Sequence, residues 1–289
     1  MKGSKKELVV KYGIMMFPTQ HPVDIAAVAQ KAESLGFDSL WVGEHPTLPV
    51  YGSQPFPGSP DGVVPPAYSW FMDPFVALSR ASGVTKTLKL GTGITLIPER
   101  NPLLLAKEIA TLDYYSGGRF MFGIGAGWHK EETEIMGGDF AHRWTQTREA
   151  IEALKVLWTQ DEAEFHGKYY DFPPVRSFPR PAQRPHPPII LGGAAKSVFQ
   201  RTVAYGDGWM PTRATPEVIE RGRNTLNELA TEAGRDPKSI EIIAYLVPAD
   251  REGLAGLEQA GTDAAILMLD CEPEDAAVAE LERIAQTVF

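Results

Sequence analysis

The chain has 289 residues, enough to bury a large core, and its hydrophobic (43%) and charged (22%) fractions are ordinary for a globular protein. A net charge of −9 without a run of lysines or arginines argues against a nucleic-acid partner, and no segment approaches the roughly 18 uninterrupted apolar residues of a membrane span. The single cysteine, Cys271, excludes an internal disulfide and a multi-cysteine metal site. We therefore expect a cytoplasmic protein.

Short apolar, β-branched segments alternate along the chain with longer segments of helical period. We predict strands at Leu8–Phe17, Ser39–Gly43, Leu88–Thr95, Arg119–Gly125, Pro188–Gly193, Gly208–Pro211, Ile240–Val247 and Ala264–Leu269. We predict helices at Val23–Leu35, Asp73–Ser82, Pro102–Tyr115, Thr145–Trp158, Lys196–Ala204, Pro216–Ala233, Glu252–Gln259 and Pro273–Thr287. Pairs such as Asp73-Pro74 and Asn101-Pro102 place a capping residue before a proline, which is typical of a first helical turn.

Eight strands, each followed by a helix, predict an α/β protein with a (β/α)₈ TIM barrel, a fold that typically needs about 250 residues. A doubly wound open sheet is the rival, but no G-x-G-x-x-G motif opens a helix after the first strand. We therefore expect one barrel domain over residues 1–289.

Two segments exceed the minimal repeat and predict insertions after strand 2 and before strand 5. Pro46–Met72 is rich in proline, glycine and aromatic residues, and Gln160–Pro187 contains an apparent hairpin, AEFHGKYYDF. Long connections in a compact domain are usually lids or binding loops. The aromatic content of the first insertion predicts packing over a site, with Trp70 and Phe71 as candidate substrate or lid residues.

In such barrels the loops after the strands build the active site. Most predicted strand ends here carry glycine, small or apolar residues, and Glu44-His45 at the end of the second strand is the exception. This pattern disfavours a metal hydrolase, so we expect no metal site. It suits a flat, largely apolar cofactor approached closely by the backbone, with His45 as the candidate proton-transfer group.

Glycines stand out in two of the predicted strands, the third and the fifth. Gly91 and Gly93 lie inside a predicted strand, where glycine marks a bulge or close approach by a ligand or another backbone, or else a barrel-corner bend. Gly192-Gly193 leads directly into a helix, so free N–H groups there would suit a phosphate. Trp128, after the fourth predicted strand, would either pack or serve as a further substrate or lid residue.

The recurring segments together resemble the bacterial luciferase-like monooxygenase superfamily, and within it the oxidoreductases that depend on the deazaflavin coenzyme F420. The matching segments are AESLGFDSLWVGEHP, LGTGITLIPERNPLLLAKEIATLDYYSGGRFMFGIGAGW, RPHPPIILGGAAKSV and AYGDGWMP. The resemblance implies a homodimeric barrel with the cofactor ring over the strand ends, and often a non-prolyl cis peptide in the third strand, here at Gly93-Ile94.

Position by position, the resemblance implies that His45 lies at the reactive edge of the ring. Glu44, the residue before it, is a second candidate catalytic residue. It implies cofactor contacts from Thr92, Gly93, Ile94, Gly125, Ala126, Gly127, Gly192, Gly193 and Ala194. Sugar-phosphate dehydrogenases of this family have a glutamate where Trp128 stands here. We therefore do not expect glucose-6-phosphate as substrate, and we expect an apolar or aromatic one.

Three functions remain open from the sequence. The leading one is hydride transfer between C5 of F420 and an organic substrate; the second is an FMN-dependent monooxygenase of the same fold. The third is a non-catalytic flavin-binding protein, which would not require His45. Glu44 would either orient the imidazole or turn away to bond the backbone, and the opposite faces of strand neighbours favour the second option.

Overall fold

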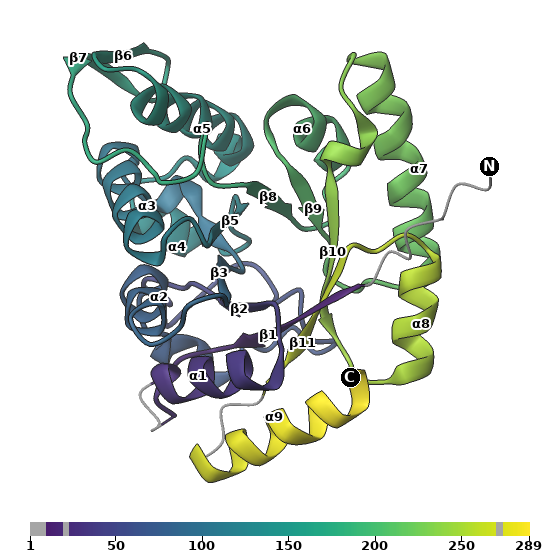
Figure 1. The fold of residues 1–289 in the computed structure, drawn as a ribbon. Coiled ribbons are helices and arrows are strands. Elements are labelled where there is room, and N and C mark those ends of the chain that lie inside the picture. Colours follow the sequence, from purple (N-terminus) through teal and green to yellow (C-terminus); the bar gives the residue numbers. More distant parts are fainter. Residues whose placement is uncertain (1–9, 20–22, 270–273) are drawn as a thin grey trace.

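A computed structural model describes residues 10–19, 23–269 and 274–289, and in these residues eight parallel strands close into a barrel (Figure 1). The barrel strands are β1 (Lys11–Met16), β2 (Ser39–Val42), β3 (Lys89–Thr92), β5 (Phe120–Gly125), β8 (Ile189–Gly192), β9 (Gly208–Met210), β10 (Glu241–Val247) and β11 (Ala264–Met268). Pairing of β3 with β5 and of β1 with β11 completes the ring. This confirms the predicted fold class.

Helices surround the strands, as Figure 1 shows. They are α1 (Ile25–Leu35), α2 (Pro74–Ser82), α3 (Pro102–Ser116), α4 (Lys130–Ile135), α5 (Arg143–Thr159), α6 (Val198–Tyr205), α7 (Pro216–Glu232), α8 (Arg251–Gln259) and α9 (Glu274–Val288). The predicted caps form: the Asp73 side chain accepts hydrogen bonds from the N–H groups of Phe75 and Val76, and Asn101 begins α3 in the same way. Within the described residues, no helix has the length and apolar composition needed to cross a membrane.

Both predicted insertions are present. The first contains the short 3₁₀ helix η1 (Pro66–Trp70), and the second forms an antiparallel hairpin of β6 (Ala163–His166) and β7 (Asp171–Val175), which projects beyond α5 in Figure 1.

The structure differs from the predicted elements in two places. The third predicted strand is interrupted after Thr92 and resumes as the two-residue β4 (Thr95–Leu96), followed by the 3₁₀ turn η2 (Ile97–Glu99). Helix α4 was not predicted, because its six residues span less than two helical turns and show no clear apolar period. Residues 8, 9 and 273 of the predicted elements lie outside the described residues.

Buried apolar side chains form two layers. One fills the interior of the barrel and includes Met15, Trp41, Met121, Tyr245 and Ile266. The other lies between the strands and the helices, where hydrophobic strand residues such as Leu40 and Phe122 face helix residues such as Leu154. This double burial explains why the barrel strands read as nearly continuous apolar segments.

Candidate active site at the carboxyl end of β2

His45 lies directly after β2, where the barrel strands end. Its Nδ1 atom lies 2.7 Å from Oε2 of Glu132, which comes from α4, and the exposed fractions of the two side chains are 7% and 0%. An ionised carboxylate only accepts hydrogen bonds, so Nδ1 carries the proton of this contact and Nε2 is the nitrogen left for a ligand. The pair is thus a buried imidazole–carboxylate unit at the catalytic rim.

Glu132 is a site residue that the sequence analysis missed. It lies in the first turn of α4, where its backbone N–H donates to Nδ1 of His129, the residue that caps the helix (3.3 Å). Its second oxygen accepts a longer hydrogen bond from the N–H of Thr47 (3.4 Å). The available signal was the HKEE segment just after the fourth predicted strand, because acidic residues favour a helix N-terminus.

Aromatic side chains surround His45 on the side of the first insertion. The ring centres of Tyr68, Phe71 and Trp128 lie 5.2, 5.9 and 6.0 Å from that of the imidazole. Phe71 in turn stacks on Phe17 at 4.5 Å. The structure therefore brings two of the expected lid residues, Phe71 and Trp128, to the histidine.

The expected lid residue Trp70 ends η1, immediately before Phe71, and 39% of it is exposed. Phe56, deeper in the same insertion, lies 5.4 Å from Trp128 between ring centres. The insertion thus lies against the loop that follows β5.

Glu44 has a role different from the expected catalytic one. Its Oε1 accepts from Nε of Arg100 (2.6 Å) and its Oε2 accepts from the N–H of Leu96 (2.9 Å). The residue is 4% exposed, and burial raises the pKa of its carboxyl against the opposing effect of Arg100. With both oxygens bonded to Arg100 and Leu96, Glu44 turns away from the imidazole, as strand alternation indicates, and anchors the turn after β4.

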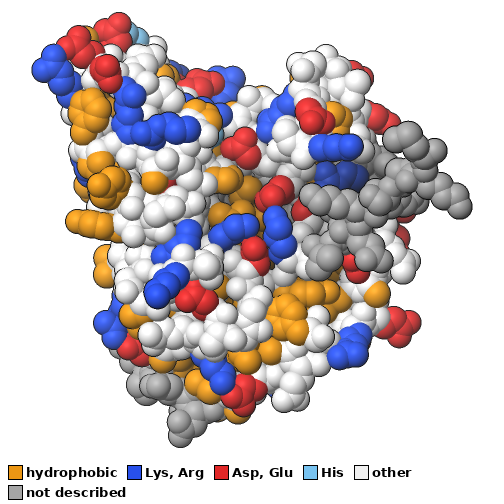
Figure 2. All heavy atoms as spheres, viewed as in Figure 1, with side chains coloured by type: hydrophobic (Ala, Val, Ile, Leu, Met, Phe, Trp, Pro, Cys, Tyr) orange, Lys and Arg blue, Asp and Glu red, His pale blue; other side chains and the backbone are white. Residues whose placement is uncertain are grey.

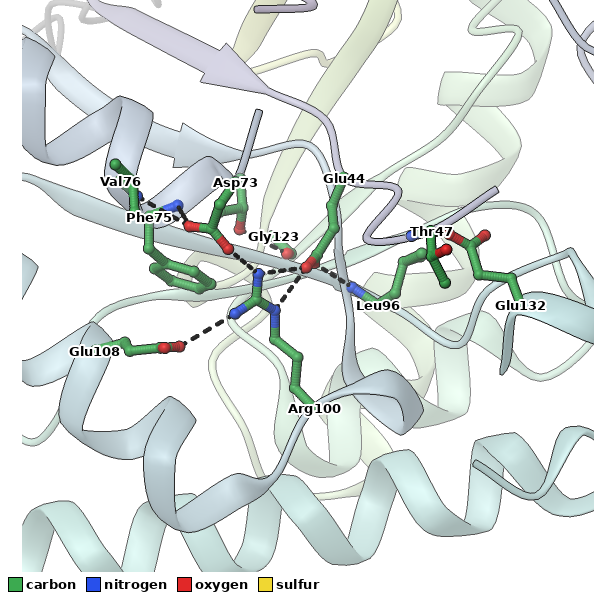
Figure 3. A network of polar contacts seen from close by, with 11 residues as sticks. Glu44, Thr47, Asp73, Phe75, Val76, Leu96, Arg100, Glu108, Gly123 and Glu132 are labelled. Carbon is green, nitrogen blue, oxygen red and sulfur yellow. Dashed lines mark hydrogen bonds and ion pairs between the residues drawn. The ribbon is translucent and has the colours of Figure 1, made fainter. Parts of the chain in front are cut away.

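Arg100 is the centre of this anchoring network (Figure 3). Its guanidinium also bonds Asp73 (2.6 Å) and Glu108 (3.1 Å), and it lies over the ring of Phe75 at 4.7 Å. The three carboxylates come from the end of β2 (Glu44), the residue that caps α2 (Asp73) and helix α3 (Glu108). Their contacts with Arg100 connect these segments to the turn after β4. The network holds the strand end that carries His45.

The interruption of the third strand matches the expectation of a bulge, and the peptide bond between Gly93 and Ile94 is cis. The carbonyl of Gly93 accepts a hydrogen bond from the Tyr245 hydroxyl of β10 across the barrel (2.5 Å). Thr92, an expected cofactor contact, donates its hydroxyl to the carbonyl of Gly123 (2.8 Å) and is fully buried.

The Ile94 side chain accounts for two of the glycines assigned to the cofactor. A Cβ added at Gly125 would overlap Cδ1 of Ile94, and one at Gly192 would lie 2.8 Å from its Cγ2. Both positions therefore need glycine to accommodate this isoleucine, whatever else binds there. Ala126, next to Gly125, is 3% exposed and contributes little accessible surface.

Gly193 differs from the expectation that its N–H is free. That N–H donates to the carbonyl of Met210 at the end of β9 (3.0 Å). However, its φ of +97° requires a glycine, and no heavy atom lies within 4 Å of a Cβ added there. The space beside Gly193 is therefore open, and the next residue, Ala194, is exposed. Gly127, with φ of +77°, likewise adopts the left-handed conformation.

A family model for luciferase-like monooxygenases matches residues 10–255, and the chain belongs to this family. The chain is 35% identical to the uncharacterised protein Rv0953c of Mycobacterium tuberculosis over 276 residues, which cover 95% of this chain and 97% of that one. Family members depend on F420 or on FMN.

Two further relatives represent these two cofactors. A solved F420-dependent secondary alcohol dehydrogenase, in complex with an F420–acetone adduct, superposes with a TM-score of 0.76 at 19% identity, over 97% of this chain and 99% of that one. At this identity the likeness shows the fold. An FMNH₂-dependent dimethylsulfone monooxygenase of Pseudomonas putida is 31% identical over 177 residues, 60% of this chain and 47% of the relative.

Proposed function

We propose that the protein is an F420-dependent oxidoreductase that moves a hydride between C5 of the deazaflavin and an apolar or aromatic organic substrate. The observation that carries the proposal is the buried His45–Glu132 pair, 2.7 Å apart, facing an aromatic cluster at the carboxyl end of the barrel. A non-catalytic flavin-binding protein has no need of such a pair.

The site residues fit a cofactor with a flat ring and a phosphate-bearing arm. Tyr68, Phe71 and Trp128 supply apolar ring faces, and the open space at Gly193, where the loop enters α6, suits a phosphate. When bound, the deazaflavin supplies a two-electron carrier. The chain supplies binding, orientation and the handling of protons.

In the proposed mechanism, His45 gives or takes the substrate proton at Nε2. Glu132 fixes the imidazole with its proton on Nδ1 and stabilises the imidazolium that forms when Nε2 gains a second proton. The aromatic cluster excludes water and favours an apolar substrate. Tryptophan at position 128, in place of an acid, supports an apolar substrate over a sugar phosphate.

An FMN-dependent monooxygenase is the second candidate, supported by the named activity of the Pseudomonas putida relative. The solved F420-dependent dehydrogenase shares the fold over nearly the full length of both proteins, but so does a monooxygenase of Streptomyces bottropensis, so coverage does not choose between the cofactors. F420 is the leading proposal because the recurring sequence segments resemble the F420-dependent oxidoreductases.

Titration of the purified protein with F420 and with FMN, followed by quenching of ring fluorescence, tests the choice. We expect F420 to bind with the lower Kd. Tighter binding of FMN would favour the monooxygenase, and binding of neither would reject both.

We further propose that the protein is a cytoplasmic homodimer. Helices α2 and α3 expose large hydrophobic side chains on their outer surface, among them Val76 (71%), Leu104 (60%), Tyr114 (61%) and Tyr115 (76%). Figure 2 shows hydrophobic side chains along the edge where Figure 1 places α3. A second copy covering this α2–α3 surface would remove them from water.

A further inference from the structure

A second buried carboxyl group lies near the His45–Glu132 pair. Glu99, the last residue of η2, is 3% exposed. Its Oε1 accepts a hydrogen bond from the hydroxyl of Thr133 (2.9 Å), the residue after Glu132 on α4. Its Oε2 is buried and has no hydrogen-bond partner among the described residues. A buried carboxylate oxygen without a donor is costly, whereas a protonated carboxyl is not charged.

The charged groups around Glu99 also favour its protonated form. Burial is the largest cause and the nearby negative charge of Glu132 the second, and together they raise the pKa of Glu99 to about 8. Glu44 acts in the same direction. Arg100 opposes them, but its guanidinium is already shared among Glu44, Asp73 and Glu108.

Glu132 and Glu99 differ in the donors that they face. Glu132 accepts hydrogen bonds from His45 and from the N–H of Thr47, whereas in the described part of the chain Glu99 accepts one only from the Thr133 hydroxyl. A nearby negative charge disfavours the ionised form of a buried carboxyl group, and this effect is greatest for the group with fewer donors, which here is Glu99.

We propose that Glu99 is a protonated acid at neutral pH, so that Glu132 is the single carboxylate behind His45, and that Glu99 ionises as the pH rises and adds a second negative charge there. Only the O–H bond of Glu99 breaks, and its proton passes to solvent. The second charge changes the electrostatic field at the His45 imidazole. Glu99 is thus a positioning residue that acts through Glu132, and its relevance to catalysis rests on the proposed function.

Infrared spectroscopy of the cofactor-free protein tests the protonation state directly. In the difference spectrum between the wild type and Glu99→Gln, we expect a protonated-carboxyl C=O band at pH 6.5 that disappears with a midpoint near pH 8, the pKa given above. Glu134→Gln is the matched control, because Glu134 lies on the same helix but is exposed and pairs with Lys130. The spectrum of Glu134→Gln should still contain the protonated-carboxyl band at pH 6.5.

The imidazole of His45 provides a second readout. Its Cε1–H NMR resonance, assigned by its loss in His45→Ala, should change chemical shift near pH 8 as Glu99 ionises. This step should be absent in Glu99→Gln and present in Glu134→Gln. Thr133→Val removes the hydrogen bond that lowers the pKa of Glu99, so the step and the infrared midpoint should move to higher pH.

A difference spectrum without a protonated band at pH 6.5 would overturn the proposal, as would a His45 resonance step that persists in Glu99→Gln. If Glu99→Gln does not fold, the wild-type step and its shift in Thr133→Val decide the question. Because every measurement uses the cofactor-free protein, failure here is distinguishable from failure to bind F420 or FMN.

Discussion

Nδ1 of His45 and Oε2 of Glu132 lie 2.7 Å apart although 87 positions separate the residues in the sequence. The pair joins the carboxyl end of β2 to the first turn of α4, and the Glu132 side chain is fully buried. This arrangement fixes which imidazole nitrogen faces the site, and it makes the chemistry of the two residues interdependent.

Replacing His45 with alanine should lower turnover by about 10²–10⁴-fold, the usual contribution of a general acid or base, while changing cofactor affinity only modestly. Steady-state kinetics and fluorescence titration with F420 measure the two effects. His186→Ala, whose side chain lies at the opposite end of the barrel before β8, is the control and should leave both unchanged. Unchanged turnover in His45→Ala would place the chemistry elsewhere.

Glu132→Gln should lower turnover because the neutral amide stabilises an imidazolium less than the carboxylate does. If Glu132 acts only through His45, the same change made in His45→Ala should cause almost no further loss. Comparing kcat across the double-mutant cycle measures this coupling. Additive losses would show that Glu132 acts independently of the histidine.

Regular patterns in the sequence were sufficient to predict the barrel. Apolar strand segments, helical period and caps such as Asp73 are local signals, and each predicted strand has its counterpart in the structure. The break between Thr92 and Thr95 was expected from Gly93 and from the resemblance, but its stabilisation by Tyr245 depends on a contact across the barrel.

The site was less predictable, because its contacts join distant segments. Strand alternation correctly indicated that Glu44 turns away from His45, but its partner Arg100 lies 56 positions along the chain. Likewise, the N–H of Gly193 is occupied by Met210 of the neighbouring strand. Glu132 became a candidate only once α4 was placed beside β2.

Gly193→Val should weaken cofactor binding, because the side chain would fill the open space beside α6. Part of any effect comes from forcing a φ of +97° on a β-branched residue, so a matched control is needed. Gly234→Val is suitable, since Gly234 has a φ of +70°, no heavy atom within 4 Å of an added Cβ, and a position at the end of α7.

Both glycine variants should unfold at lower urea concentration than the wild type, but only Gly193→Val should raise the Kd for F420. Equal affinities in the two variants would limit Gly193 to its role in the turn.

Arg100→Met should strongly destabilise the fold, because it leaves Glu44 buried without its cation. Removing one partner of a buried ion pair typically costs about 3–5 kcal/mol. Urea unfolding measures the loss, and Glu108→Gln, which removes the weaker and more exposed partner at 3.1 Å, should cost much less. Similar losses in both variants would contradict the central role assigned to the Glu44 contact.

Leu104→Asp should convert the proposed dimer to a monomer, because it places a charge in the exposed apolar surface of α3. Size-exclusion chromatography with light scattering gives the mass of each species. Val50→Asp is the control, since Val50 is 88% exposed but lies on the first insertion. A wild type that is monomeric at all concentrations would reject the dimer, and a dimeric Leu104→Asp would reject this surface as its interface.

The free energy of unfolding should depend on pH through Glu99. Its pKa is raised from 4.5 to about 8 by burial and by Glu132, so between these values the folded protein holds a proton that the unfolded chain has lost. Stability from this group is therefore fully present below pH 4.5, falls as the pH rises, and is lost above about pH 8.

Glu99→Gln removes this dependence, so the variant should gain stability relative to the wild type across that window, at up to ~1.4 kcal/mol per pH unit. Urea unfolding of both proteins at pH 5, 6.5 and 8.5 measures the difference, with Glu134→Gln as the exposed control on α4. A constant difference between Glu99→Gln and the wild type would show that Glu99 is ionised in the folded protein at all three pH values, and would contradict its assignment as a neutral acid behind the His45–Glu132 pair.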